Sequence, residues 1–387
     1  MKQYSRKLLF ILAAAILVCS LAIGAQAQEA AQLSPVVMQN EYGSVTYPTL
    51  SGYPTVQDAV NKAIYDKAAI AARLETLNGL EADGWGLQVD YRSTLKSDVL
   101  SVLVSALGEM ENGRMGQVYT SVSFDLATGK SIAAEDMFTD VEGAFSYMEG
   151  KLDEEVAPNL SGYTENDQLT PIPRDNFFLT LEGITFFYPQ DQFSMLSGYS
   201  GGCSFYWYEL ADYLNLSEGS LLNKLDAGSY LTLSPDSAGP IQEAVKEGQL
   251  PGIDARIGEN LTDVFDKYRL LVEPDYYPGG RFFEVEAPEF RSTWLLSDAL
   301  TESYDASQVQ GIRADRVNLY GLQPGVTTRE DWQAVLGQPE STTELDEYSA
   351  EDYRLPAGTS DYYRFGDNRL LLHADETGTL VSVQLIK

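Results

Sequence analysis

The sequence has very few of the side chains that carry out most enzyme and metal chemistry. Its 387 residues include one histidine, His373, and two cysteines, Cys19 and Cys203. A Ser-His-Asp or Cys-His site would have to use His373, and a zinc site needs three or four suitable ligands. The sequence therefore predicts no catalytic residue, no metal site and no cofactor. We expect His373 to be a structural or surface residue.

Basic residues are also scarce. The chain has 26 lysines and arginines against 57 aspartates and glutamates, a formal net charge of −31. Binding to a nucleic-acid backbone needs clustered basic side chains, so we expect no nucleic-acid partner. A strongly negative surface attracts cations and basic proteins. It also keeps an exported protein soluble, and charge alone does not separate these two explanations.

Only one apolar run is long enough to suggest membrane targeting, and it lies at the N-terminus. Three features follow one another in the order of a secretory signal peptide: Lys2, Arg6 and Lys7, then the apolar residues 8–23, then Ala25-Gln26-Ala27. We therefore expect residues 1–27 to be a signal peptide that is cleaved after Ala27. The alternatives are an uncleaved anchor, for which the run is short, and lipid attachment at Cys19, which lacks a small residue before it.

Cleavage would leave an acidic chain with a single thiol. It would remove three basic residues and no acidic one, which leaves 23 of the 26 basic residues and a net charge of about −34. Cys203 would be the only cysteine, so no intrachain disulfide could form. A secreted protein of this size without disulfides is typical of a Gram-positive bacterium. The predicted location is extracellular or on the cell wall, with no transmembrane segment in the mature chain.

The length of the mature chain suggests two domains. The stretch "SPDSAGP", residues 234–240, combines two prolines and a glycine with small polar residues and is predicted to be a linker. It separates a first domain over residues 35–233 from a second domain over residues 241–387. Helix and strand signals occur in both parts. We predict an α+β fold in which each domain is an antiparallel sheet with helices packed on it.

Two strong element signals lie in the first half of this first domain. Residues 56–77 carry an apolar stripe at helical spacing, and Thr55 is the expected helix cap. Residues 99–107 form a nearly continuous apolar run. The run predicts a strand that is buried on both faces.

Two further signals concern a hairpin and a capped helix. "FFLTLEGITFFY" predicts two short strands joined at Glu182-Gly183. In "GVTTREDWQAVLGQP", Thr327 and Thr328 are the candidate caps of a helix that ends at Gly337.

The stretch "GYSGGCSFYWYEL", residues 198–210, predicts a strand after a glycine-rich turn. Alternation places Cys203 with Phe205 and Trp207 on one face, and Tyr206 and Tyr208 on the other. We expect Cys203 to be a small buried hydrophobe and no nucleophile. Tyr206 and Tyr208 are the only candidate binding residues, because exposed aromatic side chains can anchor a partner.

Three motifs in order give the first domain a resemblance to a known group. "YPTLSGYPTVQDAVNKAI", "SVSFDLATGKSIAAEDMF" and "FFLTLEGITFFYPQDQFSMLSGYSGGCSFYWYELADYL" together resemble the extracellular domains of RsiV-like anti-sigma factors and PdaC-type deacetylases. The resemblance covers about half of the chain and implies an α+β domain of unknown function with a binding or sensing role, in RsiV-like proteins towards lysozyme. The sigma-binding segment and the deacetylase domain are missing, and "NGRMG" stands where many members carry a histidine.

The second domain resembles a known group more weakly, and two of its own segments are similar to each other. "GLQPGVTTREDWQAVLGQP" resembles the helix entry of protein-binding modules related to the beta-lactamase inhibitor protein (BLIP) and to BamE. "DYYPGGRFF" at 275–283 is similar to "DYYRFGDNRLL" at 361–371. A degenerate tandem repeat and two independent hairpins with similar turns are both open explanations.

These observations lead to a functional hypothesis and an alternative. The hypothesis is a secreted binding or sensing protein that is not an enzyme and recognises a cationic protein such as lysozyme, or a cell-wall component. The alternative is a carboxylate-dependent hydrolase of cell-wall glycans, because acidic residues are abundant. The acidic clusters at 153–155, 346–347 and 351–352 are expected to lie on solvated surfaces.

Overall fold

The computed structural model describes most of the chain beyond the predicted signal peptide, which lies outside the described residues. The described residues are 32–80, 86–109, 115–157, 168–190, 192–193, 201–265, 269–270, 274–277, 280–286, 292–299, 304 and 306–387. None of the helices within these ranges has the length and apolarity needed to cross a membrane.

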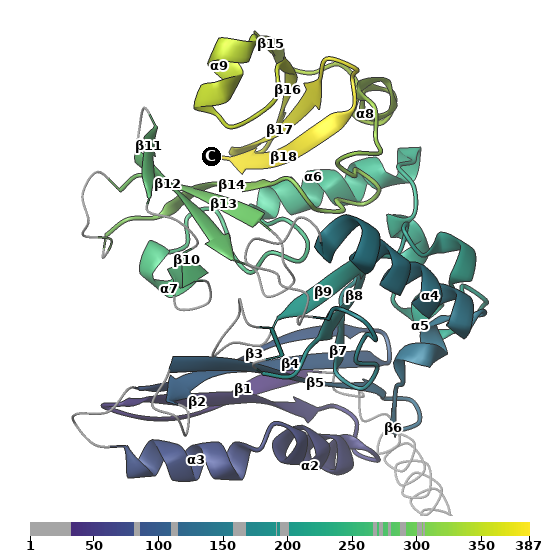
Figure 1. Ribbon diagram of the computed structural model, residues 1–387, viewed down its shortest axis with the longest axis vertical. Coiled ribbons are helices and arrows are strands. Elements are labelled where there is room, and N and C mark those ends of the chain that lie inside the picture. The colour runs from purple at the N-terminus through teal and green to yellow at the C-terminus, as the bar shows by residue number, and fades with distance from the viewer. Residues whose placement is uncertain are drawn as a thin grey trace, which may run out of the picture.

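The first region begins with a six-stranded sheet in simple chain order. Its strands are β1 (Gln32–Asn40), β2 (Gly43–Ser51), β3 (Leu87–Lys96), β4 (Val99–Glu109), β5 (Met115–Asp125) and β6 (Lys130–Ser131). Every pair is antiparallel except β2 with β3, which run parallel. A parallel pair needs a long crossover, and the chain supplies it with α2 (Gln57–Lys67) and α3 (Ile70–Gly79), which cover one face of the sheet (Figure 1).

The expected single helix over 56–77 is interrupted. Ala69 adopts a left-handed conformation with φ 49°, and this residue separates α2 from α3. Thr55 does not cap the helix; instead the carbonyl of Tyr53 accepts from the amides of Val56 and Gln57 and forms the entry turn. The apolar stripe survives the break, because Val60, Ile64, Ile70 and Leu77 all lie in one core.

A second, three-stranded sheet lies on the opposite face of the first. It consists of β7 (Phe177–Leu179), β8 (Gly183–Phe187) and β9 (Gly202–Tyr206). The predicted strand at 99–107 is confirmed as buried on both faces: Leu100 and Val102 face the helices, and Leu103 packs against Phe178 and Phe187 of the small sheet. The predicted hairpin through Glu182 and Gly183 is confirmed as β7–β8.

Helices complete the core of the small sheet. The helix α4 (Val141–Lys151) is capped by Asp140 and continues as a π-helical turn over Leu152–Val156. Phe145 of α4 meets Phe186 of β8 edge-on at a centroid distance of 5.8 Å. The short helix α5 (Leu221–Lys224) and 3-10 turns at Ala134–Met137, Ala211–Tyr213 and Ala227–Tyr230 close this core.

The second region is one antiparallel sheet of nine strands. The order is β10-β12-β13-β14-β18-β17-β16-β15, with β11 paired to β12. Its strands are β10 (Arg269–Leu270), β11 (Asp275–Tyr277), β12 (Gly280–Glu286), β13 (Ser292–Ser297), β14 (Val309–Ala314), β15 (Ser341–Leu345), β16 (Gly358–Phe365), β17 (Asn368–Asp375) and β18 (Leu380–Ile386). Strands β12–β14 form one meander and β16–β18 form another, and the pairing of β14 with β18 joins them. The first Asp-Tyr-Tyr segment is β11, which pairs with β12, and the second lies in β16, which pairs with β17.

The described part of this second region includes the helices α6 (Ala238–Glu247), α7 (Leu261–Phe265), α8 (Arg329–Leu336) and α9 (Glu347–Asp352). Ile241 of α6 and Trp332 of α8 are fully buried in the core of the large sheet. The predicted capping of α8 is confirmed, because the Thr328 hydroxyl and the Asp331 carboxylate form a reciprocal capping box.

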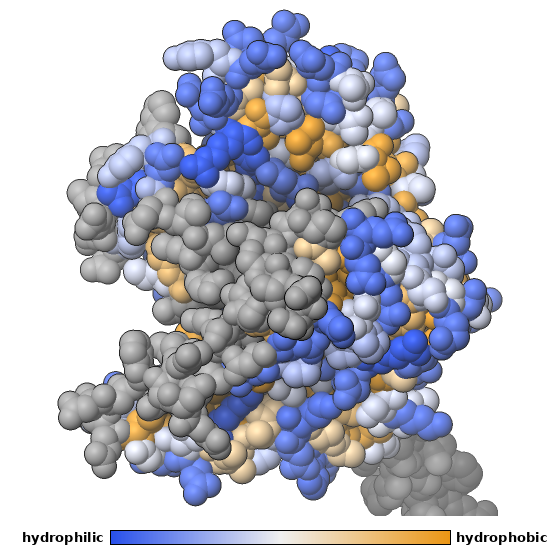
Figure 2. All heavy atoms as spheres, in the orientation of Figure 1, coloured by the Kyte–Doolittle hydropathy of each residue, from blue (hydrophilic) through white to orange (hydrophobic). Residues whose placement is uncertain are grey.

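The α+β class predicted from the sequence is confirmed, with antiparallel sheets in both regions. The first region, however, contains two sheets, and the larger one includes a parallel pair. Residues 234–240, expected as a linker, form a capping box at Ser234, a 3-10 turn over Pro235–Ser237 and the start of α6. Figure 2 shows a largely hydrophilic described surface on one face of the molecule, in keeping with the acidic composition.

Candidate binding cleft

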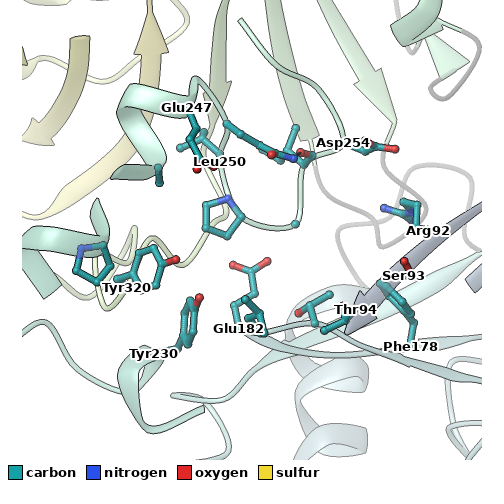
Figure 3. Close-up of a pocket in the computed structure, with 18 of the residues that line it drawn as sticks. Arg92, Ser93, Thr94, Phe178, Glu182, Tyr230, Glu247, Leu250, Asp254 and Tyr320 are labelled. Carbon is teal, nitrogen blue, oxygen red and sulfur yellow. Dashed lines mark hydrogen bonds between the residues drawn. The ribbon is translucent and has the colours of Figure 1, made fainter. Parts of the chain in front are cut away.

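A cavity of about 640 Å³ lies between the two regions. One wall comes from the first region: residues 91–94 of β3, Phe178 of β7, and residues 180–182 of the β7–β8 turn. The other wall comes from the second region: one side of α6, from Pro240 to Glu247, and residues 249–254 after it. Tyr230 and Tyr320 close one end (Figure 3). Ligand sites of this size are common where two folded units meet.

Glu182 is the most deeply placed charged residue of the cleft. Its side chain has no exposed surface, and Figure 3 shows its carboxylate turned into the cavity. The turn that holds it is tight: the Glu182 carbonyl accepts from the Trp207 amide at 2.9 Å, and a Cβ atom at Gly183 would lie 2.3 Å from the Phe205 carbonyl oxygen. Its carboxylate accepts from the Asn318 amide at 3.3 Å, so a residue of the second region touches it.

Two stacked tyrosines form the end wall. The rings of Tyr230 and Tyr320 lie 4.9 Å apart with an interplanar angle of 27°. Burial and the hydrogen bond with Tyr320 raise the pKa of Tyr230, so its hydroxyl is neutral at physiological pH. Asn318, which is fully buried, fixes this corner by donating to the Tyr230 carbonyl at 2.7 Å and accepting from the Gly321 amide at 2.8 Å.

The remaining charges make the cleft acidic. Glu243 and Glu247 on α6 are exposed at its rim, and Asp254 is half-buried. Glu243 forms an ion pair with Lys246 at 2.6 Å. Arg92 is the one basic side chain of the described lining, and its guanidinium lies 6.0 Å from the ring centroid of Phe178. The lining has four carboxylates against one guanidinium, and the Lys246 ammonium beside Glu243 offsets one of them, so the cleft is net negative.

The two tyrosines named from the sequence lie elsewhere. Tyr206 is 1% exposed, so the expectation of an exposed aromatic face does not hold for it; Arg316 of the second region lies over its ring at 5.7 Å. Arg316 also donates to the Ser204 carbonyl at 3.0 Å. Tyr208 is half-buried and stacks on Tyr206 at 5.6 Å. This face of β9 therefore packs against the second region, and neither tyrosine lines the cleft.

The two remaining residues with reactive side chains are buried apart from the cleft. Cys203 is 3% exposed, as expected, and burial raises the pKa of its thiol to about 12, which disfavours the nucleophilic thiolate. His373 is fully buried and its ring nitrogens bond Ser360 and the Pro356 carbonyl, both at 2.9 Å. His373 is therefore structural.

The acidic clusters at 153–155, 346–347 and 351–352 do not line the cavity. Within the described residues, no group of three or more His, Cys, Asp or Glu side chains is placed to hold a metal ion. Sequence reasoning missed Glu182 as a site residue because it appeared only as a hairpin turn. A charged residue directly before an obligatory glycine, between two aromatic strands, is the one local signal that could have marked it.

Comparison with known proteins identifies similar domains of unknown function. No model of a known protein family matches the sequence, and no curated protein matches it either. Similar solved structures include a DUF4309-family protein (YjgB) from Bacillus subtilis, at 16% identity over 40% of this chain and 97% of that chain, with a TM-score of 0.28.

Two DUF3298-family proteins are also similar. The one from Bacteroides fragilis has 12% identity over 52% of this chain and 99% of that chain, and the one from Pseudomonas aeruginosa has 14% identity over 48% and 93%. Both have a TM-score of 0.33. The RsiV-like and PdaC-type resemblance stays a prediction.

Proposed function

We propose that the protein is a secreted, non-enzymatic binding or sensing protein that holds a cationic partner, such as a lysozyme-like muramidase, at the cleft between its two regions. The observation that carries the proposal is the cleft itself, with Glu182, Glu243, Glu247 and Asp254 in its lining. The net charge of −31 supports it, because a field of one sign steers oppositely charged partners to the surface.

The test is retention of a basic partner on the immobilised full chain. We expect a lysozyme-type muramidase to be retained at low salt and released at high salt, since exposed charges are screened beyond about 10 Å at 0.1 M ionic strength. An acidic protein of similar size should pass through. If neither the muramidase nor a cell-wall fragment is retained at low salt, the proposal fails.

A matched pair of double variants separates the cleft from the overall charge. Glu243→Gln with Glu247→Gln removes two charges at the rim of the cleft, and Glu344→Gln with Glu376→Gln removes two exposed charges elsewhere. We expect a larger loss of retention from the first pair. An equal loss from both pairs would mean that the partner responds to net charge only, and the cleft would lose its role.

The hydrolase alternative uses the same cavity. Glu182 is a buried carboxylate within it, and buried carboxyl groups serve as general acids in glycan hydrolysis. Product release from wall glycans by the full chain, abolished in Glu182→Gln, would favour the hydrolase. Absence of turnover would leave the binding function.

A further inference from the structure

We propose that the protein pairs with a second copy of itself through strand β1, in antiparallel orientation, so that the two six-stranded sheets join into one. The proposal goes beyond the binding function of the cleft and does not depend on it. Three observations carry it: the open edge of β1, the absence of charge along it, and the exposure of two large apolar side chains, Val37 and Met38.

Strand β1 is a long edge strand of the first sheet. Within the part of the chain that the structure describes, it pairs with β2 along all nine of its residues and with no other strand. The opposite edge of this sheet, β6, has only two residues, and β15, at an edge of the large sheet, has five. An unpaired strand edge is a template for a further strand, and a short edge offers few bonding groups. A partner strand would therefore gain more hydrogen bonds on β1 than on these two edges.

The odd-numbered residues of β1 direct their backbone groups to the open edge. Pro35 stands opposite Pro48, and neither residue has an N–H, so this pair is not one of the hydrogen-bonded pairs that alternate along an antiparallel ladder. The even-numbered Ser34 points its carbonyl to the other side, where it accepts from the Thr49 hydroxyl of β2 at 3.1 Å. By alternation, the amides and carbonyls of the odd-numbered residues are available to a partner strand.

A two-fold axis at Val36 uses this edge fully. It places Val36 opposite Val36 of the second copy, pairs Leu33 with Gln39, and pairs Pro35 with Val37. Each pair of Leu33 with Gln39 can exchange two hydrogen bonds, and each pair of Pro35 with Val37 can form one, because Pro35 can only accept. Every outward amide of the strand then meets an outward carbonyl of the second copy.

The absence of charge on β1 favours a second copy over a charged partner. Neither β1 nor β2 contains a charged residue, whereas the whole chain has a formal net charge of −31. Natural edge strands are often protected by charged side chains, and β15 carries the exposed Glu344. Two copies of so acidic a chain can approach closely only where charges are few. A basic partner would gain no ion pair from this hairpin.

Val37 and Met38 give the edge apolar surface to bury. Their side chains are 51% and 48% exposed. Neighbouring residues of a strand point to opposite faces, so one apolar side chain lies on each face of the sheet at this edge. With the axis at Val36, Val37 lies opposite Pro35 and Met38 lies opposite Ser34 of the second copy. Burial of this apolar surface adds to the backbone hydrogen bonds.

The assembly should stop at two copies. Antiparallel pairing of β1 with β1 uses the same edge on both chains, which makes the interface isologous and the dimer closed. The joined sheet would end at β6 of each copy, which has two residues and offers almost no edge to a third chain.

The first experiment measures the mass of the full chain by sedimentation over a range of concentrations. We expect a monomer–dimer equilibrium without larger species. Salt screens the repulsion between two acidic copies, so the dissociation constant of the dimer should fall about threefold or more at high salt. A chain that stays monomeric at every concentration, or a dimer that weakens at high salt, would overturn the proposal.

A matched pair of glutamate variants tests whether the contact lies on β1. Met38→Glu puts a charge into the proposed contact, and we expect the dissociation constant to rise about tenfold or more, because the charge loses water when the strands pair. Val326→Glu, at a valine of the second region that is 56% exposed, adds the same charge outside β1 and should leave the dimer unchanged. Equal effects of the two variants would contradict a contact through β1.

A cysteine cross-link tests the antiparallel register and does not depend on the glutamate variants. The Cα atoms of a non-hydrogen-bonded pair lie about 4.5 Å apart, which a disulfide can span. Val36→Cys should therefore form a covalent dimer under mild oxidation, and Val326→Cys should not. Cys203 is buried, and the unaltered chain is the control for both native cysteines. A sample that sediments as a dimer but gives no covalent dimer from Val36→Cys would refute the proposed pairing.

The result is distinguishable from that of the proposed function. Retention of a basic partner should decrease at high salt, whereas the dimer should become tighter. Met38→Glu should separate the two copies and leave retention at the cleft unchanged. Glu243→Gln with Glu247→Gln should lower retention and leave the dimer in place, so either proposal can fail while the other stands.

Discussion

The two regions of the protein bury their polar groups in different ways. In the first region, neutral hydroxyl pairs join neighbouring strands within each sheet: Ser101 with Ser123 at 2.8 Å and Thr185 with Ser204 at 2.7 Å. In the second region, the fully buried Asp361 forms a two-bond ion pair with Arg329, at 2.8 and 2.9 Å. The hydroxyl pairs carry no charge and the Asp361 pair carries a full one. The fully buried carboxylate of the first region, Glu182, lies at the boundary between the regions, where the Asn318 amide of the second region donates to it.

The buried Asp361 carboxylate accepts more hydrogen bonds than the buried hydroxyl groups of the first region do. Besides Arg329, three side chains donate to the Asp361 carboxylate at 2.7 to 3.2 Å: Thr342, Gln333 and Trp332. A buried charge destabilises the folded state unless it is paired and hydrogen-bonded. Removal of one partner of a buried ion pair is therefore strongly destabilising, because the other charge stays without compensation. The second region should therefore be more sensitive to single substitutions and to pH than the first.

Asp361→Asn tests this difference with the largest expected effect. Loss of the charge leaves Arg329 without its carboxylate partner, and we expect the free energy of unfolding to fall by about 3–5 kcal/mol. Urea unfolding followed by tryptophan fluorescence measures it, because Trp332 lies beside Asp361.

The chain offers a matched control for this substitution. Asp275 begins the other Asp-Tyr-Tyr segment, but its side chain is 58% exposed and it pairs with Arg354 at 3.4 Å. Exposed pairs contribute about 0–1 kcal/mol, so Asp275→Asn should have little effect. Similar losses from both variants would remove the distinction between buried charge and surface charge on which the comparison rests.

Asn318→Ala tests the seam between the two regions. The substitution leaves the Tyr230 carbonyl and the Gly321 amide without the bonds that Asn318 provides. Unsatisfied buried groups cost about 1–3 kcal/mol each, so we expect a loss of about 2–3 kcal/mol. Hydrogen exchange over residues 227–233 and 317–323 should become faster. Asn223→Ala, on the exposed side of α5, is the control, and equal exchange in the two variants would show that Asn318 does not hold the seam.

The parts of the fold that were predicted from the sequence have local causes. The run at 99–107 has apolar residues at both even and odd positions, which predicts a strand that is buried on both faces. The capping box of α8 needs only residues 328–331, which are adjacent in the sequence. The break between α2 and α3 was missed because Ala68 and Ala69 are good helix formers. Tertiary packing holds Ala69 at φ 49° against that preference.

The cleft could not be predicted in the same way. Its lining comes from β3, the β7–β8 turn, Tyr230, α6 with the loop after it, and Tyr320, and the first and last of these residues, Tyr91 and Tyr320, lie 229 positions apart. No spacing rule brings such segments together.

The two faces of β9 follow the alternation of the sequence, as predicted. Tyr206 is nevertheless buried, because the second region covers it, and the contact between the two regions could not be predicted from the local sequence.

The pH dependence of stability sharpens the comparison further. His373 is the only histidine of the chain, and burial lowers its pKa in the folded state. The unfolded chain binds a proton below about pH 6.5 while the folded one does not. The stability that the neutral His373 contributes should therefore be fully present above about pH 6.5 and should decrease as pH falls towards the pKa of His373 in the folded state. Urea midpoints at pH 7.5 and 5.5 should differ more for the native chain than for His373→Gln; equal differences would assign the slope to other groups.

At lower pH, the hydrogen-bonded ion pair around Asp361 adds a second loss of stability in the second region. Hydrogen bonds from Arg329, Gln333, Thr342 and Trp332 outweigh the effect of burial and lower the pKa of Asp361. Stability from this group is present above about pH 4 and is lost as pH falls through the lower folded value. Both contributions lie in the second region, so acid should loosen that region first.

Cys203→Ala gives the smallest expected effect and tests the neutral side of the comparison. The thiol is buried in the core of the small sheet and lies 3.6 Å from the Tyr188 hydroxyl. Loss of one heavy atom there should cost about 1 kcal/mol. Because the pKa of the thiol is raised to about 12, the group stays neutral, and the cost should be equal at pH 7.5 and 5.5. A cost that grows as pH falls would show that the first region also depends on a titrating group, and the contrast between neutral and charged interiors would then not account for the pH response.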